Sequence, residues 1–97
     1  MEYSIGMFAR SLAGHDKEKL YLISKIDSEY VYLVDGKTRT IDNPKKKRKK
    51  HIQIDYQVMD LIKEKLETKC ELRNEDIARA IKLKKSKGYK EEENVES

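Results

Sequence analysis

Hydrophobic and polar residues mix over short, strand-length stretches in the first half of this 97-residue chain. Such runs, rich in β-branched and aromatic residues, are typical of β-strands. The predicted strands are residues 5–11, 20–23 with Ile26, 30–34, 37–41 and 51–54. Five short strands over about fifty residues favour a small barrel over a sandwich, because closure removes exposed strand edges.

Turn residues separate these strands. Asp27-Ser28 offers a sharp reversal between residues 20–26 and 30–34, which predicts a hairpin. Asp35-Gly36 is a signal for a tight turn, since both residue types tolerate positive φ. It predicts a second hairpin, in which residues 37–41 pair with residues 30–34.

The hydrophobic period changes after residue 54. Val58, Met59, Ile62 and Leu66 recur at spacings of three and four residues, which places one apolar stripe on a helix. Asp55 is the expected N-cap of this helix.

A second helix is predicted after a break at residues 68–70. Glu75 and Asp76 would lie in its first turn, where the helix dipole favours acidic side chains, and Leu72 would pack against that turn. Gly88 is the expected stop. The two helices are expected to form a hairpin packed against the barrel.

The predicted fold class is therefore mainly β with C-terminal α: a small SH3-like barrel followed by a helical hairpin. Residues 1–54 would form the barrel, residues 55–88 the hairpin, and residues 89–97 a disordered acidic tail. Charged residues make up 41% of the chain and hydrophobic residues 37%, and at this length only a modest core can form.

The sequence shows no charged start followed by a long apolar stretch. Neither a signal peptide nor a membrane span is therefore expected. The single cysteine, Cys70, excludes an internal disulfide. A cytoplasmic protein with no membrane partner, monomeric when free, is expected.

The positive charge of the chain is concentrated in one place. Residues 37–51 contain eight Lys or Arg against one Asp, whereas the segments on either side are slightly acidic. Six of the eight are consecutive: Lys45, Lys46, Lys47, Arg48, Lys49 and Lys50. A surplus gathered in fifteen residues suits a polyanion such as nucleic acid.

The sequence gives little support to catalysis. A nucleophilic cysteine needs an assisting base, and the two histidines, His15 and His51, stand in no recognisable catalytic motif with Cys70. One cysteine and two histidines also lack the spacing of a zinc site. Neither an enzyme nor a cofactor is expected.

The segment from Ile5 to Lys17 resembles the KOW motif, in which an alternating strand enters a glycine-containing loop and a second strand leaves it. Residues 20–23 fit the exit strand. Together with residues 34–39 and the basic run, this half of the chain is similar to KOW-domain RNA-binding proteins of the ribosomal protein L-fourteen-e type. The resemblance implies an SH3-like barrel that binds structured RNA, with ribosomal RNA as the leading candidate and ribosomal proteins as further partners.

RNA binding requires cations that neutralise phosphates and backbone that can approach closely. The candidate RNA-binding residues are Gly14, Lys17, Lys37, Arg39, Lys45, Lys46, Lys47, Arg48, Lys49 and Lys50. Lys37 and Arg39 are expected to extend the basic patch along the second hairpin. Tyr21, Tyr30 and Tyr32 are secondary candidates for base stacking, although strand tyrosines are more often packing residues.

Other interpretations of the same features stay open. The basic run could be a solvated loop or a nuclear-import signal. The KOW motif also occurs in transcription elongation factors, so a protein-interaction module of the transcription or translation machinery is the main alternative. An apolar helix stripe that was exposed would favour that alternative, and a buried one would remove its main surface.

Overall fold

A computed structural model of the chain describes residues 3–12, 14 and 19–86. Its elements, in chain order, are β1 (Met7–Ser11), β2 (Leu20–Ile26), β3 (Tyr30–Val34), β4 (Lys45–Arg48), a short 3-10 helix η1 (Lys49–His51), β5 (Ile52–Val58), α1 (Asp60–Glu67) and α2 (Asn74–Lys85).

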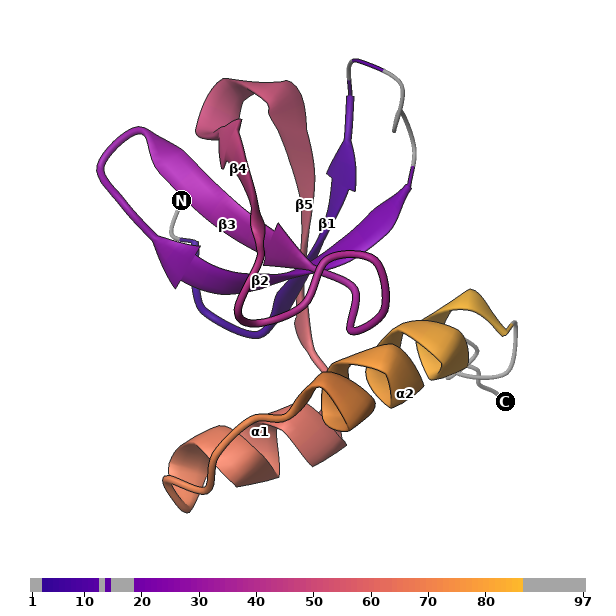
Figure 1. The fold of residues 1–97 in the computed structure, drawn as a ribbon. Coiled ribbons are helices and arrows are strands. Elements are labelled where there is room, and N and C mark those ends of the chain that lie inside the picture. The colour runs from indigo at the N-terminus through magenta and orange to yellow at the C-terminus, as the bar shows by residue number, and fades with distance from the viewer. Residues whose placement is uncertain (1–2, 13, 15–18, 87–97) are drawn as a thin grey trace.

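The five strands form one antiparallel sheet in the order β4-β3-β2-β1-β5. The two strands at its edges, β4 and β5, follow each other in the chain and are joined by η1. Figure 1 shows a strongly curved sheet with both helices lying together on one side of it. The prediction of a mainly β fold with C-terminal helices is confirmed at this level.

The alternation along the central strands supplies two hydrophobic cores, because successive side chains point to opposite faces of a sheet. The core between sheet and helices contains Phe8, Leu20, Leu22, Val34, Met59, Ile62, Ile77, Ala80 and Ile81. The core on the other face contains Ala9, Tyr21, Ile23, Val31, Leu33 and Ile52. Each face of the sheet therefore carries a buried apolar cluster, and the helices cover one of the two.

The predicted second hairpin is wrong. Residues 37–41 form no strand, and β3 pairs instead with the basic segment β4 on the side away from β2. The Asp35 carboxylate closes the turn instead: its Oδ1 accepts hydrogen bonds from the backbone N–H groups of Lys37 and Arg39, both at 2.8 Å. The chain then crosses to α2 before it returns to the sheet.

Gly36 is the point where this crossing touches the helix. Its φ is +83°, and a Cβ placed on it would lie 2.4 Å from the backbone oxygen of Asn74 and 2.7 Å from the nitrogen of Ala78. Farther along, the Ile41 N–H donates to Asn74 Oδ1 at 2.9 Å. Glycine is required here because the loop backbone packs directly on the start of α2.

The predicted helix start at Asp55 is also wrong. β5 continues to Val58, Met59 is the N-cap of α1, and the helix begins at Asp60. Asp55 is a strand residue that forms an ion pair with Lys84 of α2. Lys84 also donates to Gln57 Oε1 at 3.1 Å, so this half-buried lysine connects α2 to β5.

The start of α2 at Asn74 agrees with the acidic residues predicted for its first turn. Asp76 Oδ2 accepts a hydrogen bond from the Arg73 N–H at 3.0 Å and lies 3.3 Å from Lys65 Nζ of α1. Leu72 packs against the core that contains Ile77, as the sequence predicted.

The expected helix stop at Gly88 and the acidic tail at 89–97 lie outside the described residues. Among the helices described, none is long and apolar enough to cross a membrane.

Candidate nucleic-acid interface

Four of the six consecutive basic residues form a strand rather than a loop. In the pairing of β4 with β3, Arg48 lies opposite Tyr30 and Lys46 opposite Tyr32. Lys46 and Arg48 are exposed, whereas Lys45 and Lys47 are half-buried. Because a strand alternates, the basic run presents two cations outward beside tyrosines and two toward the face of Val31 and Leu33.

Tyr30 is in contact with both outward cations of β4. The Lys46 ammonium is 4.3 Å from the centre of the Tyr30 ring, and the Arg48 guanidinium carbon is 5.5 Å from it. Both distances are within the range of cation–π attraction. The ring therefore holds the two charged groups close together on the outer surface of the sheet.

The other two candidate tyrosines have different surroundings. Tyr32 is half-buried beside Lys25, whose ammonium is 5.3 Å from its ring centre, and its hydroxyl donates to Asp27 Oδ2 at 3.1 Å. Tyr21 is only 2% exposed and belongs to a hydrophobic core. Val31 and Leu33 are in the core, whereas Tyr30 and Tyr32 are half-buried on the opposite face of β3.

The basic surface continues onto η1. Lys49 is anchored by its backbone N–H to the Glu29 carbonyl at 2.9 Å and by its ammonium to the Ser28 carbonyl at 3.1 Å. A hollow of about 290 Å³ lies between η1 and the connection from β2 to β3. It is lined by Ser28, Glu29, Arg48, Lys49 and Lys50. Glu29 is the acidic member, 4.0 Å from Arg48, in an exposed pair that water screens strongly.

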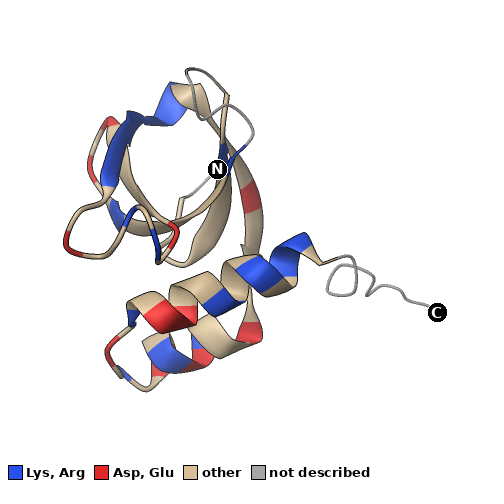
Figure 2. Ribbon diagram, turned by 45° about the vertical axis from the view of Figure 1, so that its right-hand side comes forward, with Lys and Arg blue, Asp and Glu red and all other residues tan. Residues whose placement is uncertain are grey.

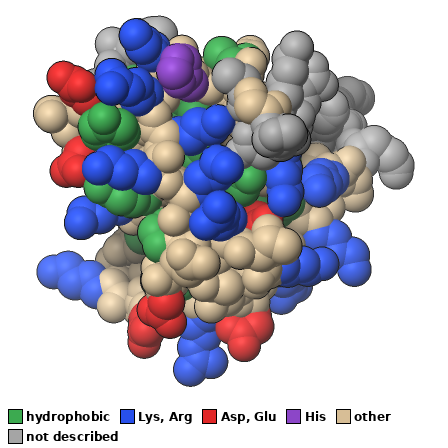
Figure 3. Space-filling model, turned by 45° about the horizontal axis from the view of Figure 1, so that its top comes forward, with side chains coloured by type: hydrophobic (Ala, Val, Ile, Leu, Met, Phe, Trp, Pro, Cys, Tyr) green, Lys and Arg blue, Asp and Glu red, His purple; other side chains and the backbone are tan. Residues whose placement is uncertain are grey.

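We call the residues of β4 together with Lys49 and Lys50 the basic strand surface. Figure 2 shows its Lys and Arg residues following one another along the ribbon of β4 and η1. Figure 3, a view of one face, shows Lys and Arg side chains spread across that face.

The remaining candidate residues do not all join this surface. The loop that carries Lys37 and Arg39 is not a strand beside β4, so the patch does not extend along a second hairpin. Arg39 is half-buried, and Lys37 lines a hollow beside α2. Gly14 is exposed with a φ of +88°, which suits a glycine loop, and Lys17 lies outside the described residues.

Sequence reasoning missed the lysines of α2 that accompany Lys37. The same hollow is lined by Lys82 and Lys85, which with Ala78 follow the helical spacing of four and three residues. That spacing was visible in the sequence. What the sequence did not contain was the position of the Lys37 loop, because contacts with the distant Asn74 place it there.

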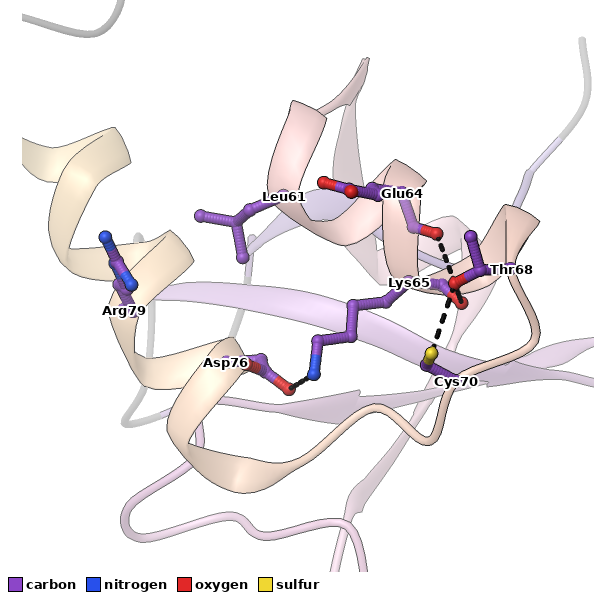
Figure 4. A pocket seen from close by; sticks show the side chains of 7 residues that line it. All are labelled: Leu61, Glu64, Lys65, Thr68, Cys70, Asp76 and Arg79. Atoms are coloured by element: carbon purple, nitrogen blue, oxygen red, sulfur yellow. Dashed lines mark hydrogen bonds and ion pairs between the residues drawn. The ribbon is translucent and has the colours of Figure 1, made fainter.

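Cys70 lies at a cavity of about 270 Å³ between α1 and α2 (Figure 4). The Lys65–Asp76 ion pair is in this cavity, and the Thr68 hydroxyl is 3.2 Å from Cys70 Sγ. The described residues that line the cavity include no histidine, so they offer this thiol no imidazole base. Over the described part of the chain there is also no group of three or more metal-ligating side chains.

The apolar stripe predicted for the first helix is largely internal. Met59 and Ile62 are 2% and 0% exposed, Val58 packs against the same core from β5, and Leu66 is exposed. A protein-docking module that used this stripe would therefore lack its main surface.

Comparison of the chain with protein-family models and with curated protein sequences gave no match.

Proposed function

We propose that this protein is a non-catalytic RNA-binding protein whose basic strand surface contacts RNA phosphates. The observation that carries the proposal is the ordered arrangement of six consecutive basic residues on β4 and η1, with Lys46 and Arg48 held on the ring of Tyr30. Like charges on neighbouring residues repel one another, so their concentration in one short segment is more useful for binding a polyanion than for solubility.

The arrangement supports recognition of backbone and shape more than of sequence. Lysine ammonium groups act as point charges for phosphates, and Arg48 adds a planar fork that matches phosphate oxygens. Phosphate contacts position an RNA without reading its bases. We therefore propose structured RNA as the ligand, with ribosomal RNA as the leading candidate in a cytoplasmic setting.

We further propose that the sheet is a KOW-type, SH3-like barrel. Two features support this: the edge strands β4 and β5 are consecutive in the chain, and the short turn η1 joins them. In a strongly curved sheet such a connection brings the two edges toward each other. Gly14 has a positive φ and lies between β1 and β2, which is compatible with a role as the loop glycine of a KOW motif.

The proposal is tested by titrating the full chain with a structured RNA over a series of salt concentrations. If four of the cations each neutralise one phosphate, the logarithm of the affinity should fall against the logarithm of salt with a slope on the order of −3 to −4. Replacing Lys46 and Arg48 together by Ala should reduce the magnitude of the slope by about 2.

A slope near zero for the unaltered protein would refute electrostatic RNA binding. Crosslinking in cells, followed by sequencing of the bound RNA, would then identify the RNA class.

A further inference from the structure

A second basic surface lies on the side of the molecule where the β3–β4 loop meets α2. A hollow of about 400 Å³ opens there, and four lysines from three separate segments line it. Lys19 precedes β2, Lys37 belongs to the loop, and Lys82 and Lys85 belong to the last turns of α2. We call this site the lysine groove.

Within the part of the chain that the structure describes, few groups compete with a ligand for the cations of the lysine groove. Lys37, Lys82 and Lys85 are exposed, and none of them forms an ion pair with another described residue. Lys19 forms an ion pair with Asp35, whose Oδ2 lies 3.7 Å from the ammonium nitrogen. Among the described residues that line the hollow, one carboxylate against four ammonium groups leaves an excess of three positive charges.

The walls of the groove are held in place before any ligand arrives. Asp35 fixes the loop through hydrogen bonds from two backbone N–H groups and from the Thr38 hydroxyl, at 2.7 to 2.8 Å. Gly36 packs on the backbone of α2 at Asn74 and Ala78. A preorganised site loses less free energy on binding than one that must first be ordered.

The chemistry of the lining favours phosphates over a peptide. An acidic peptide would gain most of its affinity by inserting an apolar or aromatic anchor into a pocket. The apolar floor, Leu20 and Ile81, is only 3% and 6% exposed and offers little surface for such an anchor. The described lining contains no aromatic residue or arginine, so a ligand meets mainly ammonium groups and the Thr38 hydroxyl.

We propose that the lysine groove is a second phosphate-binding site, which takes the backbone of the same RNA that the basic strand surface binds. This inference rests on the proposed RNA-binding function and adds a second contact to it. The molecule measures 38 × 29 × 27 Å, so an RNA stem of roughly 16 base pairs is long enough to reach both surfaces.

The test compares salt series for binding of the full chain to an RNA hairpin with a stem of about 16 base pairs. The variant is Lys82→Ala with Lys85→Ala. The control is Lys63→Ala with Arg79→Ala, which removes two exposed helical cations outside the groove. We expect the groove variant to reduce the magnitude of the salt slope by about 1.8 and to bind roughly 60-fold more weakly at 0.1 M salt, while the control retains most of its affinity.

Amide shifts of the unaltered protein provide a readout that does not depend on the folding of any variant. Addition of the hairpin should move the signals of Thr38, Ala78 and Lys82. Unchanged signals there, or equal losses for the groove variant and the control, would overturn the second contact while leaving RNA binding by β4 in place. Larger shifts at these residues with a poly-glutamate peptide than with the hairpin would overturn the assignment to RNA. Absence of any binding by the unaltered protein would refute the proposed function itself.

Discussion

At the scale of single residues, Tyr30 determines how the cations of β4 are presented. Its ring lies against both Lys46 and Arg48, at 4.3 and 5.5 Å from the ring centre. Each exposed cation–π contact is worth about 0.5–1 kcal/mol. The tyrosine thus restricts two long, flexible side chains whose ordering would otherwise weaken binding.

Replacing Tyr30 by Ala should therefore weaken RNA binding about 2- to 5-fold at fixed salt, because the cations remain but lose their common support. The salt slope should not change, since the number of phosphate contacts stays the same. The measurement is a titration with a structured RNA. Tyr30→Phe, which keeps the ring, is the control and should bind like the unaltered protein; a loss as large as that of Tyr30→Ala would contradict this role of the ring.

Asp35 is the residue on which the β3–β4 loop depends. Burial of its carboxyl raises its pKa, but hydrogen bonds from the Arg39 backbone, the Thr38 hydroxyl and the Lys37 backbone, together with the charge of Lys19, outweigh burial. The pKa of Asp35 is consequently held below its ordinary value of 3.8. The ionised carboxylate therefore stabilises the folded chain at neutral pH, and this contribution is lost as the pH falls through the lowered pKa.

Asp35→Asn should lower the free energy of unfolding at pH 7 by about 1–3 kcal/mol. The reason is that a partly buried carboxylate, which accepts three hydrogen bonds, is replaced by an uncharged amide. The difference from the unaltered protein should shrink as the pH falls below 3.8 and through the lowered pKa of the native carboxyl. Urea unfolding at pH 7 and pH 3 measures both values. A difference that stayed constant or grew in acid would exclude this role for the carboxylate.

At the scale of elements, the β3–β4 connection shows how a contact distant in sequence can override a local turn signal. Asp35-Gly36 is a good hairpin turn by composition, yet here Gly36 uses its positive φ to bring the chain against α2. The Ile41 N–H then bonds to Asn74, 33 residues farther along.

Gly36→Ala should lower the free energy of unfolding by about 2–4 kcal/mol, the sum of an unfavourable φ and a clash with the backbone of Asn74. Thermal or urea unfolding gives the value. Lys37→Ala, a neighbouring change at an exposed side chain, should stay within about 0.5 kcal/mol of the unaltered protein. Equal effects of the two substitutions would show that the loop does not depend on close packing at Gly36.

The local pattern of hydrophobic and polar residues was sufficient to predict elements that bury at least one of their faces. β3 matches the predicted residues 30–34, and α2 starts at the acidic turn that the sequence indicated. β4 was missed because four basic residues in a row carry no alternation and lysine is a poor strand former. Its strand conformation comes from pairing with β3, which a local pattern does not contain.

The predicted start of the first helix was wrong for a related reason. Val58 fits the spacing of the helical stripe, yet it is the last residue of β5 and packs against the same core from the sheet. The charges of the basic strand surface could be found from sequence, whereas the lysine groove required the folded position of the Lys37 loop.

At the scale of the whole molecule, sheet and helices share one core. Phe8, Leu20, Leu22 and Val34 of the sheet are at most 3% exposed, and the residues that cover them come from Met59 onward. Burial of such side chains is worth about 1.5–3 kcal/mol each, a large share of the stability of a small protein.

A chain that ends at Val58 should therefore not unfold cooperatively and should self-associate, because one apolar face of its sheet is uncovered. A chain that ends at Ser86 retains every described element and is the control. Circular dichroism during thermal unfolding, together with the amide proton spectrum, distinguishes the two. A well-dispersed spectrum and a sharp transition for the chain ending at Val58 would show that the sheet folds independently.

The position of β4 at the edge of the sheet gives its charges a second consequence. Edge strands are the places where a sheet can pair with a sheet of another molecule, and lysines on them oppose such pairing by mutual repulsion. The basic residues that we propose for RNA therefore also protect the folded chain against aggregation. Bound phosphates would neutralise that repulsion, so the RNA itself must keep neighbouring copies apart while it is bound.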